Sequence, residues 1–305
     1  MTIALLLYVI IGFLGAAMGS FAGAQVWRLR ARQLVQDKQA GEPYDKAEYK
    51  RLVGLTKSTI ATDRSRCLSC SHTLAWYDLL PIVSWISTKG ACRYCHKPIG
   101  RFELAMEVGT ALAFVVFTFT WLSAMGTGAL SICILVLWLV ALTMFVILFA
   151  YDLKWFLLPD IIMFPLIGLS IVITALSVYG LQGGEILPSV LSVIASIGIL
   201  AGLYFMLWYV SKGMWVGFGD VKLGIALGIL LIDWKLALLT LFLANLLGTL
   251  VVLPGLLTGK LSRKTQVPFG PFLIVGFFIS VLWGTVILNS YNDFSQWLTT
   301  FMLML

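Results

Sequence analysis

Residues 1–32 read MTIALLLYVIIGFLGAAMGSFAGAQVWRLRAR, and this stretch decides the class of fold. The first charged side chain of the chain is Arg28, which Arg30 and Arg32 follow closely. A membrane-spanning helix needs about 20 consecutive apolar residues, whereas a cleavable signal peptide begins with basic residues and has a shorter apolar core. The stretch therefore predicts a spanning helix that ends at a basic boundary.

The composition of the whole chain agrees with a membrane protein. Of the 305 residues, 60% are hydrophobic and 11% are charged, whereas soluble domains average about 45–50% apolar and about 25% charged residues. Between Arg28 and Glu103 there are 14 basic and 7 acidic side chains, so this segment carries the whole net charge of +7. A water-soluble globular protein is excluded.

Further uncharged or nearly uncharged runs predict an all-α polytopic membrane protein with about eight transmembrane helices. The positive-inside rule places the N-terminus outside and residues 28–103 in the cytoplasm. The run at 222–232 is short for a full crossing of the bilayer. The runs after the first lie at about 104–124, 129–150, 161–179, 186–210, 222–232, 236–257 and 268–289.

Four of the five cysteines form two CxxC pairs, Cys67 with Cys70 and Cys92 with Cys95, separated by 21 residues. Cysteines on the cytoplasmic side stay reduced, so this pattern indicates a metal rather than disulfides. Two thiolates two residues apart chelate one edge of a tetrahedron, and the second pair closes it as a structural zinc site. The alternative is four reduced thiols without a metal.

The two histidines and the fifth cysteine need not be zinc ligands. His72 and His96 each adjoin a CxxC pair and could replace a thiolate, or they are exposed neighbours. Cys133 lies within a predicted span as a small apolar residue. We expect three parts: a first transmembrane helix at 1–27, a cytoplasmic zinc-binding loop domain at 28–103, and a seven-helix membrane domain at 104–305.

Two aspartates lie at ends of predicted spans on the same side of the membrane: Asp152 in FAYDLKWFLLPD and Asp220 in GFGDVKLG. Ionisable residues in or beside spanning helices are costly and are therefore candidates for function. Two such carboxyls could share one proton and act as an aspartyl-protease dyad. Gly217 and Gly219 would let a substrate strand approach the backbone. The alternative is a helix-starting turn capped by Asp220.

Four other charged residues in or beside the predicted spans need an interpretation as well. Asp160 is a rival for the first catalytic position, although it also suits the N-cap of the next span. Lys154 and Lys222 each stand two residues beyond a candidate aspartate and would anchor the cytoplasmic face. Glu107 has no basic partner nearby in sequence.

Five motifs in this order resemble the prepilin peptidase family, the membrane aspartyl proteases that process type IV pilins and type II secretion pseudopilins. The resemblance covers most of the chain. The motifs are GSFAGAQVWRLR at 19–30, LAWYDLLPIVSW between the CxxC pairs, YDLKWFLLPD at 151–160, GFGDVKLG at 217–224 and VPFGPFLIVG at 267–276.

The resemblance implies that Asp152 and Asp220 are the catalytic pair, rather than Asp160. It also implies cleavage of a short basic leader after a Gly at the cytoplasmic face of the bacterial inner membrane. Many family members then methylate the new N-terminus with S-adenosylmethionine, and the zinc-knuckle loop usually accompanies this two-function form. The implied partners are prepilin or pseudopilin precursors. The basic residues around 46–57 and 64–70 could suggest nucleic acid, but a cytoplasmic loop beside a membrane is basic for topological reasons, so the lipid bilayer is the simpler partner and we expect no nucleic acid.

The sequence departs from the family pattern around the loop linked with methylation. Gly23 stands where an Asn is common, Arg30 or Ala31 where a Pro is common, Leu68 where a Pro often follows the first cysteine, and Phe102-Glu103 where Tyr-Pro is usual. None of these departures touches the two aspartates. The alternative function from another class is a proton- or ion-coupled transporter with a cytoplasmic zinc regulatory module.

Overall fold

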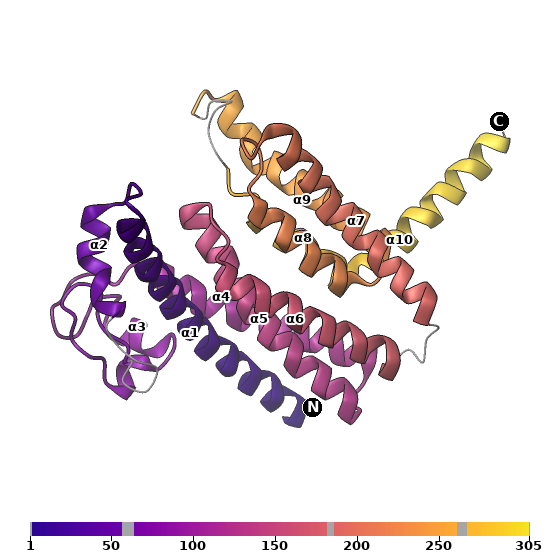
Figure 1. Ribbon diagram of the computed structural model, residues 1–305. Helices are drawn as coiled ribbons and strands as arrows, with labels where there is room; N and C mark the ends of the chain where they lie inside the picture. The colour runs from indigo at the N-terminus through magenta and orange to yellow at the C-terminus, as the bar shows by residue number, and fades with distance from the viewer. Residues whose placement is uncertain (1, 57–63, 182–185, 261–266, 305) are drawn as a thin grey trace. The chain divides into compact units, whose positions relative to one another are not determined.

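The computed structural model describes residues 2–56, 64–181, 186–260 and 267–304, and these residues contain helices and irregular segments but no β-strand. Figure 1 labels the helices α1 to α10. In chain order the elements are α1 Thr2–Ala40, α2 Lys46–Leu52, η1 Val53–Thr56, η2 Trp76–Leu79, α3 Val83–Ser87, α4 Phe102–Met125, α5 Ala129–Trp155, α6 Asp160–Leu176, η3 Ser177–Leu181, α7 Ile186–Ser211, α8 Phe218–Leu231, α9 Trp234–Leu257 and α10 Gly270–Met304.

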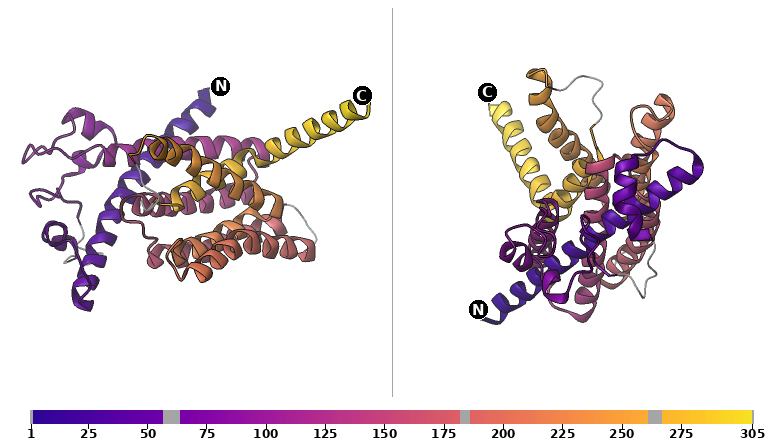
Figure 2. Two further views of the ribbon diagram at one scale, coloured as in Figure 1. Left: turned by 90° about the horizontal axis from the view of Figure 1, so that it is seen from above. Right: turned by 90° about the vertical axis from the view of Figure 1, so that its left-hand side faces the viewer.

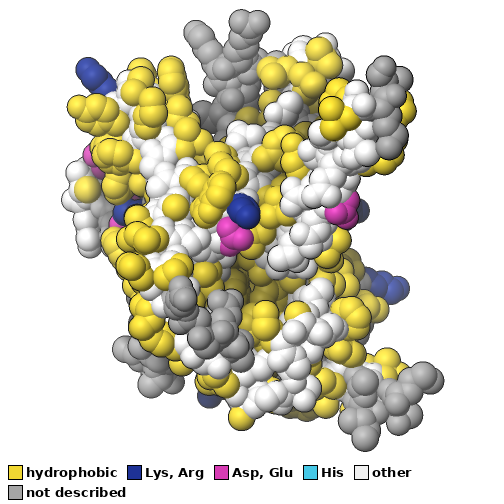
Figure 3. Space-filling view, turned by 90° about the vertical axis from the view of Figure 1, so that its right-hand side faces the viewer, with side chains coloured by type: hydrophobic (Ala, Val, Ile, Leu, Met, Phe, Trp, Pro, Cys, Tyr) yellow, Lys and Arg dark blue, Asp and Glu magenta, His cyan; other side chains and the backbone are white. Residues whose placement is uncertain are grey.

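The predicted all-α membrane fold is confirmed. Seven of the described helices are long and apolar enough to cross a membrane: α1, α4, α5, α6, α7, α9 and α10. The eighth predicted span forms α8, whose 14 residues extend only about 21 Å, against about 30 Å for the hydrocarbon core. In the face shown in Figure 3, apolar side chains dominate and charged ones are few.

The chain forms two compact units. Unit 1 comprises Met1–Ala124 and Leu142–Ala150, and unit 2 comprises Met125–Ala141 and Tyr151–Leu305. The three parts expected from the sequence were divided where the chain changes between apolar and polar residues. These units are instead groups of segments that pack together, so unit 1 combines the first helix, the polar loop and part of the expected membrane domain.

Within unit 1, small residues let α1 lie directly against α4. A Cβ atom placed on Gly15 would come 2.8 Å from the Cα of Ala111, and one on Gly19 would come 2.8 Å from the Cα of Glu107. Small residues four apart allow two helix backbones to approach closely, which is how helices associate without a hydrophobic driving force in lipid.

The first helix continues beyond the predicted boundary at residue 27, as far as Ala40. Its added turns bury Ala31 and Leu34 against Leu52 of α2, and Arg30 pairs with Glu48 at 2.7 Å. This small core supplies an apolar face outside the predicted span, so the helix does not end where the charges begin. Figure 2 shows α1 as one long helix in both views.

Unit 2 holds α8 among longer helices. Nine of the 14 residues of α8 are buried, and a Cβ on Gly228 would come 2.8 Å from the Cα of Ile197 in α7. A short helix can stay in the apolar region in this way because its neighbours, rather than lipid, surround it. The last predicted run ends at residue 289, but α10 continues up to Met304.

The packing of α1 on α4 makes a testable prediction. Gly19→Ala should lower the stability of the protein by about 1–3 kcal/mol, because the added methyl group meets backbone that has no room to shift. The matched control is Gly109→Ala in α4, where a Cβ meets nothing within 4 Å. Thermal unfolding in detergent measures both. If the two variants unfold at equal temperatures, the close approach of these helices is wrong.

Candidate active site and metal centre

Asp152 lies in the last turn of α5, where the helix ends against the start of α10. Phe156 follows in the left-handed conformation at φ 57° and donates its N–H to the Asp152 carbonyl at 2.9 Å. The Asp152 side chain is buried at 5% exposure, and its Oδ2 accepts a hydrogen bond from the backbone N–H of Gly270 at 3.1 Å. A helix N-terminus offers unpaired N–H groups and favours a carboxylate.

Gly270 is the residue that permits this contact. A Cβ placed on it would lie 2.7 Å from Asp152 Oδ2, which is closer than carbon and oxygen can approach without a shift. Any side chain at this position would therefore displace the carboxyl or break the hydrogen bond.

Asp220 is the third residue of α8, whose N-cap is Gly217. Its backbone N–H donates to the Gly217 carbonyl at 3.2 Å, and its carboxyl lies close enough to that of Asp152 for electrostatic repulsion. The structure thus brings the two predicted aspartates, which are 68 positions apart in the sequence, within range of electrostatic interaction. Gly219 faces Leu158 instead of open space: a Cβ there would lie 3.0 Å from the Leu158 Cβ.

The four predicted cysteines also lie together, within unit 1. Their sulfur atoms are all within 4.8 Å of one another, and the Cys67 and Cys95 sulfurs are 3.9 Å apart. Zinc–sulfur bonds of about 2.3 Å place tetrahedral sulfurs about 3.8 Å apart. The four thiols therefore fit a closed zinc site, and among the described residues no histidine belongs to this cluster.

The two CxxC turns share one backbone geometry. In each, the first cysteine donates its N–H to the residue five positions on, Cys67 to His72 at 3.0 Å and Cys92 to Lys97 at 2.9 Å. The residue after the second cysteine is left-handed in both, Ser71 at φ 60° and His96 at φ 56°. This repetition is a property of metal knuckles that bring both sulfurs of a pair to one side.

The comparisons with known proteins cover both regions. Residues 13–121 match the family described as Bacterial Peptidase A24 N-terminal domain, and residues 133–253 match the Type IV leader peptidase family. The "Prepilin leader peptidase/N-methyltransferase" of Aeromonas hydrophila is 31% identical over 228 residues, which are 75% of this chain and 74% of that protein. The protein of the same name from Pseudomonas aeruginosa is 27% identical over 293 residues, 92% of each chain.

The chain belongs to the prepilin peptidase family. The resemblance inferred from the sequence motifs is thereby confirmed, and the helices make this family member a multi-pass membrane protein. No solved structure matches the chain.

The other charged residues near this prepilin peptidase's aspartates have partners. Asp160 is the first residue of α6, after the N-cap Pro159, and its carboxylate accepts a hydrogen bond from Lys222 Nζ at 2.6 Å. Lys222 also lies 5.2 Å from the Phe164 ring centroid. The sequence suggested an N-cap for Asp160 and an anchor for Lys222, whereas the structure pairs them across α6 and α8.

Tyr204 of α7 is a site residue that the sequence analysis missed. Its side chain is 3% exposed, its hydroxyl has no hydrogen-bond partner among the described residues, and it is near enough to Asp220 to interact electrostatically. Its ring centroid lies 5.4 Å from that of Phe269, directly before Gly270. An unpaired buried hydroxyl costs free energy, so the phenol is a donor available to water or substrate at this site.

In unit 1, the segment between the CxxC pairs is tied to the second pair through Asp78. The Asp78 carboxylate accepts hydrogen bonds from Arg93 Nε and Tyr94 Oη, both at 2.9 Å, and from the Ala75 N–H at 3.2 Å. Burial opposes its ionisation, but these hydrogen bonds and the Arg93 charge outweigh it and lower the pKa of Asp78. The carboxylate therefore stays charged and holds the module at neutral pH.

Glu107, which had no partner in sequence, anchors the same segment to α4. Its Oε2 accepts a hydrogen bond from the Ile82 N–H at 2.7 Å. Ile82 has φ 63°, a conformation that strains a β-branched residue. The bond therefore stabilises a turn that would otherwise be unfavourable.

The cysteine cluster predicts the metal content of the protein. Material purified without chelator should carry about one zinc ion per chain, because four thiolates close a single tetrahedral site. Cys67→Ser and Cys92→Ser should each lose most of the metal. The matched control is Cys133→Ser, a free thiol in α5 outside the cluster, which should keep it.

Elemental analysis of the purified proteins gives the stoichiometry directly. A wild-type protein without zinc, or equal zinc in all three variants, would show that the cluster is not the metal site.

Proposed function

We propose that the chain is a membrane aspartyl endopeptidase that removes the short basic leader of type IV prepilins or pseudopilins, and that it also N-methylates the new N-terminus. The observation that carries the first activity is the buried Asp152 carboxyl, whose Oδ2 accepts a hydrogen bond from the Gly270 N–H at 3.1 Å and which interacts electrostatically with Asp220. The relatives named prepilin leader peptidase/N-methyltransferase support both activities.

The proposed peptidase chemistry follows from two carboxyls in a site shielded from bulk water. Like charges a few ångström apart disfavour double ionisation, so the pair holds one proton. The ionised carboxyl takes a proton from a water as that water attacks the scissile carbonyl, and the protonated carboxyl polarises the carbonyl oxygen. The leaving amine then receives a proton from the dyad, and the peptide C–N bond breaks.

We place the active site at the cytoplasmic face of the bacterial inner membrane, with the N-terminus outside. The support is the charge pattern: the 14 basic side chains between Arg28 and Glu103 follow the first span directly, and positively charged loops stay on the cytoplasmic side. A basic leader and anionic lipid would meet on that side.

Zinc in this proposal is structural. A site closed by four thiolates has no open position for a substrate, so its contribution is the folding of the loop module. Cys67, Cys70, Cys92 and Cys95 would hold the ion.

The second proposed activity uses S-adenosylmethionine. When bound, this molecule supplies a methyl group: the amine nitrogen bonds to the methyl carbon, the carbon–sulfur electron pair stays on sulfur, and the nitrogen releases a proton to solvent. The loop module would orient the cleaved N-terminus for this reaction. No specific observation among the described residues supports the alternative function, an ion-coupled transporter.

The peptidase proposal predicts that Asp152→Asn and Asp220→Asn each reduce leader cleavage by about 1,000-fold or more, because a general acid–base pair needs both carboxyls. Asp160→Asn is the matched control, since it makes the same change at a carboxyl paired with Lys222; it should retain most activity. Cleavage of a prepilin in detergent extracts measures all three. Normal turnover by either of the first two variants would refute the dyad.

The two activities should separate by mutation. Cys70→Ser combined with Cys95→Ser should disorder the module, because a small metal-closed loop lacks enough apolar core without its ion. Cleavage should fall modestly, and methylation of an already cleaved pilin peptide should fall much further. Mass spectrometry of the mature N-terminus reports both reactions.

Two results would contradict this modular account. Normal methylation by the double variant would show that the loop only helps to dock the substrate and is not needed for methyl transfer. Loss of both activities in a protein whose membrane helices remain folded would show that the two sites are coupled.

A further inference from the structure

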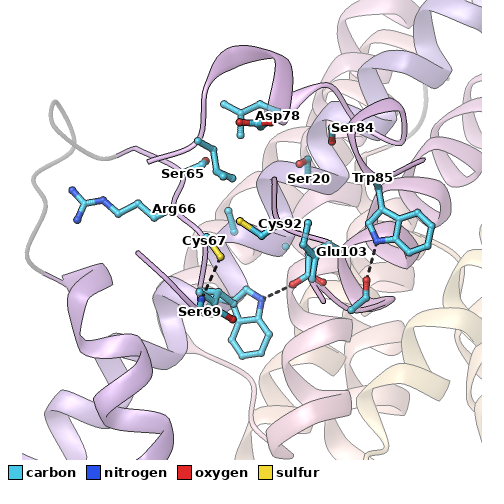
Figure 4. Close-up of a pocket in the computed structure, with 18 of the residues that line it drawn as sticks. Ser20, Ser65, Arg66, Cys67, Ser69, Asp78, Ser84, Trp85, Cys92 and Glu103 are labelled. Atoms are coloured by element: carbon cyan, nitrogen blue, oxygen red, sulfur yellow. Dashed lines mark hydrogen bonds between the residues drawn. The ribbon is translucent and has the colours of Figure 1, made fainter. Parts of the chain in front are cut away.

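Unit 1 contains a cavity that borders the cysteine cluster at Cys67 and Cys92 and extends from there to α1 and the start of α4. Its volume is about 350 Å³, within the range of about 300–1,000 Å³ for small-molecule sites. Its walls come from α1, both CxxC turns, the segment that contains Trp85, and the first turns of α4. Figure 4 shows side chains from these elements around it, Ser20, Cys67, Trp85 and Glu103 among them.

Glu103 brings an incompletely paired carboxylate to this cavity. Its Oε1 accepts a hydrogen bond from Trp27 Nε1 at 3.2 Å, but its Oε2 is buried and has no hydrogen-bond partner among the described residues. A buried carboxylate oxygen without a partner is costly. The nearby Glu107 differs, because its Oε2 is engaged by the Ile82 N–H. Of these two glutamates, Glu103 is therefore the one whose Oε2 can still interact with a bound ligand.

The other walls offer aromatic surface and positive charge. Trp27 and Phe102 pack edge to face with their ring centroids 5.8 Å apart, and Trp85 is fixed by its hydrogen bond to the Gly100 carbonyl at 2.9 Å. Arg28 and Arg101 also line the cavity. The cavity therefore combines apolar rings, a carboxylate suited to a cation, and guanidinium groups suited to a carboxylate.

We propose that this cavity binds S-adenosylmethionine and that Glu103 faces the sulfonium cation. The molecule carries a flat aromatic base, a positive sulfur and an amino-acid carboxylate, which are the three features that the walls complement. This inference rests on the methyl transfer proposed above and adds where the methyl donor binds.

The charge of the ligand provides the test. S-adenosylhomocysteine lacks the methyl group and is neutral at sulfur, whereas sinefungin carries an ammonium group in the same place. Equilibrium dialysis with the zinc-loaded, full-length protein in detergent measures the three affinities without any turnover. We expect the two cations to bind about tenfold or more tightly than S-adenosylhomocysteine, because the charge of a carboxylate attracts a nearby cation more strongly in a partly buried site than in water.

Glu103→Gln should reduce this preference to about twofold or less, by weakening the binding of the cations while leaving S-adenosylhomocysteine nearly unchanged. The amide oxygen of Gln can still accept the Trp27 hydrogen bond, and Glu103→Asp, which keeps the charge, should restore part of the preference. Glu42→Gln is the matched control, because Glu42 is exposed and does not line the cavity; it should bind like the wild type.

Each other outcome overturns the inference. An unchanged preference in Glu103→Gln, in a wild-type protein that methylates a cleaved peptide, would place the donor elsewhere while leaving the proposed function intact. Weaker binding of a cleaved pilin peptide, with unchanged binding of S-adenosylmethionine, would assign Glu103 to the acceptor amine. A wild-type protein that neither binds the donor nor methylates would refute the methyltransferase function itself.

Discussion

The hydrogen bond from the Gly270 N–H to Asp152 Oδ2, at 3.1 Å, is the constraint on which the candidate active site depends. It joins the last turn of α5 to the first residue of α10 and fixes a carboxyl that is 5% exposed. With that carboxyl held, Asp220 at the start of α8 is near enough to interact with it electrostatically. The contact also dictates glycine at position 270, since a Cβ there would lie 2.7 Å from the carboxyl oxygen.

The two candidate sites are held in different ways. The aspartates lie at the ends of apolar helices, which pack against other helices along their lengths. The zinc module has little apolar core, and its order comes from the four clustered thiols, the Asp78 network and the bond between Glu107 and Ile82. This difference is the physical basis for expecting mutations in the module to affect one activity more than the other.

Much of this arrangement could be predicted from the sequence, because local patterns determine it. Apolar runs predicted the membrane helices, and CxxC spacing predicted that the cysteines would cluster. Helix ends were less predictable: α1 passes residue 27 because Ala31 and Leu34 find a core with α2, and α8 stops short of a full span because its neighbours bury it.

Contacts between distant segments could not be predicted. Gly270 and Asp152 are 118 positions apart, and Glu107 reaches the N–H of Ile82, a backbone group that no side-chain pattern reveals. The pairing of Asp160 with Lys222 likewise replaced the separate roles that sequence suggested. Tyr204 gave no signal at all, because a tyrosine in an apolar helix is ordinary until its hydroxyl proves to be buried without a partner.

The most direct test of the account is leader cleavage by Gly270→Ala compared with Gly168→Ala. Both changes add one methyl group to a glycine in a helix, but a Cβ on Gly168 of α6 meets nothing within 4 Å. The account predicts that Gly270→Ala loses most cleavage, about tenfold or more, while its unfolding temperature stays near that of Gly168→Ala, which cleaves normally. Equal cleavage by the two variants would contradict it.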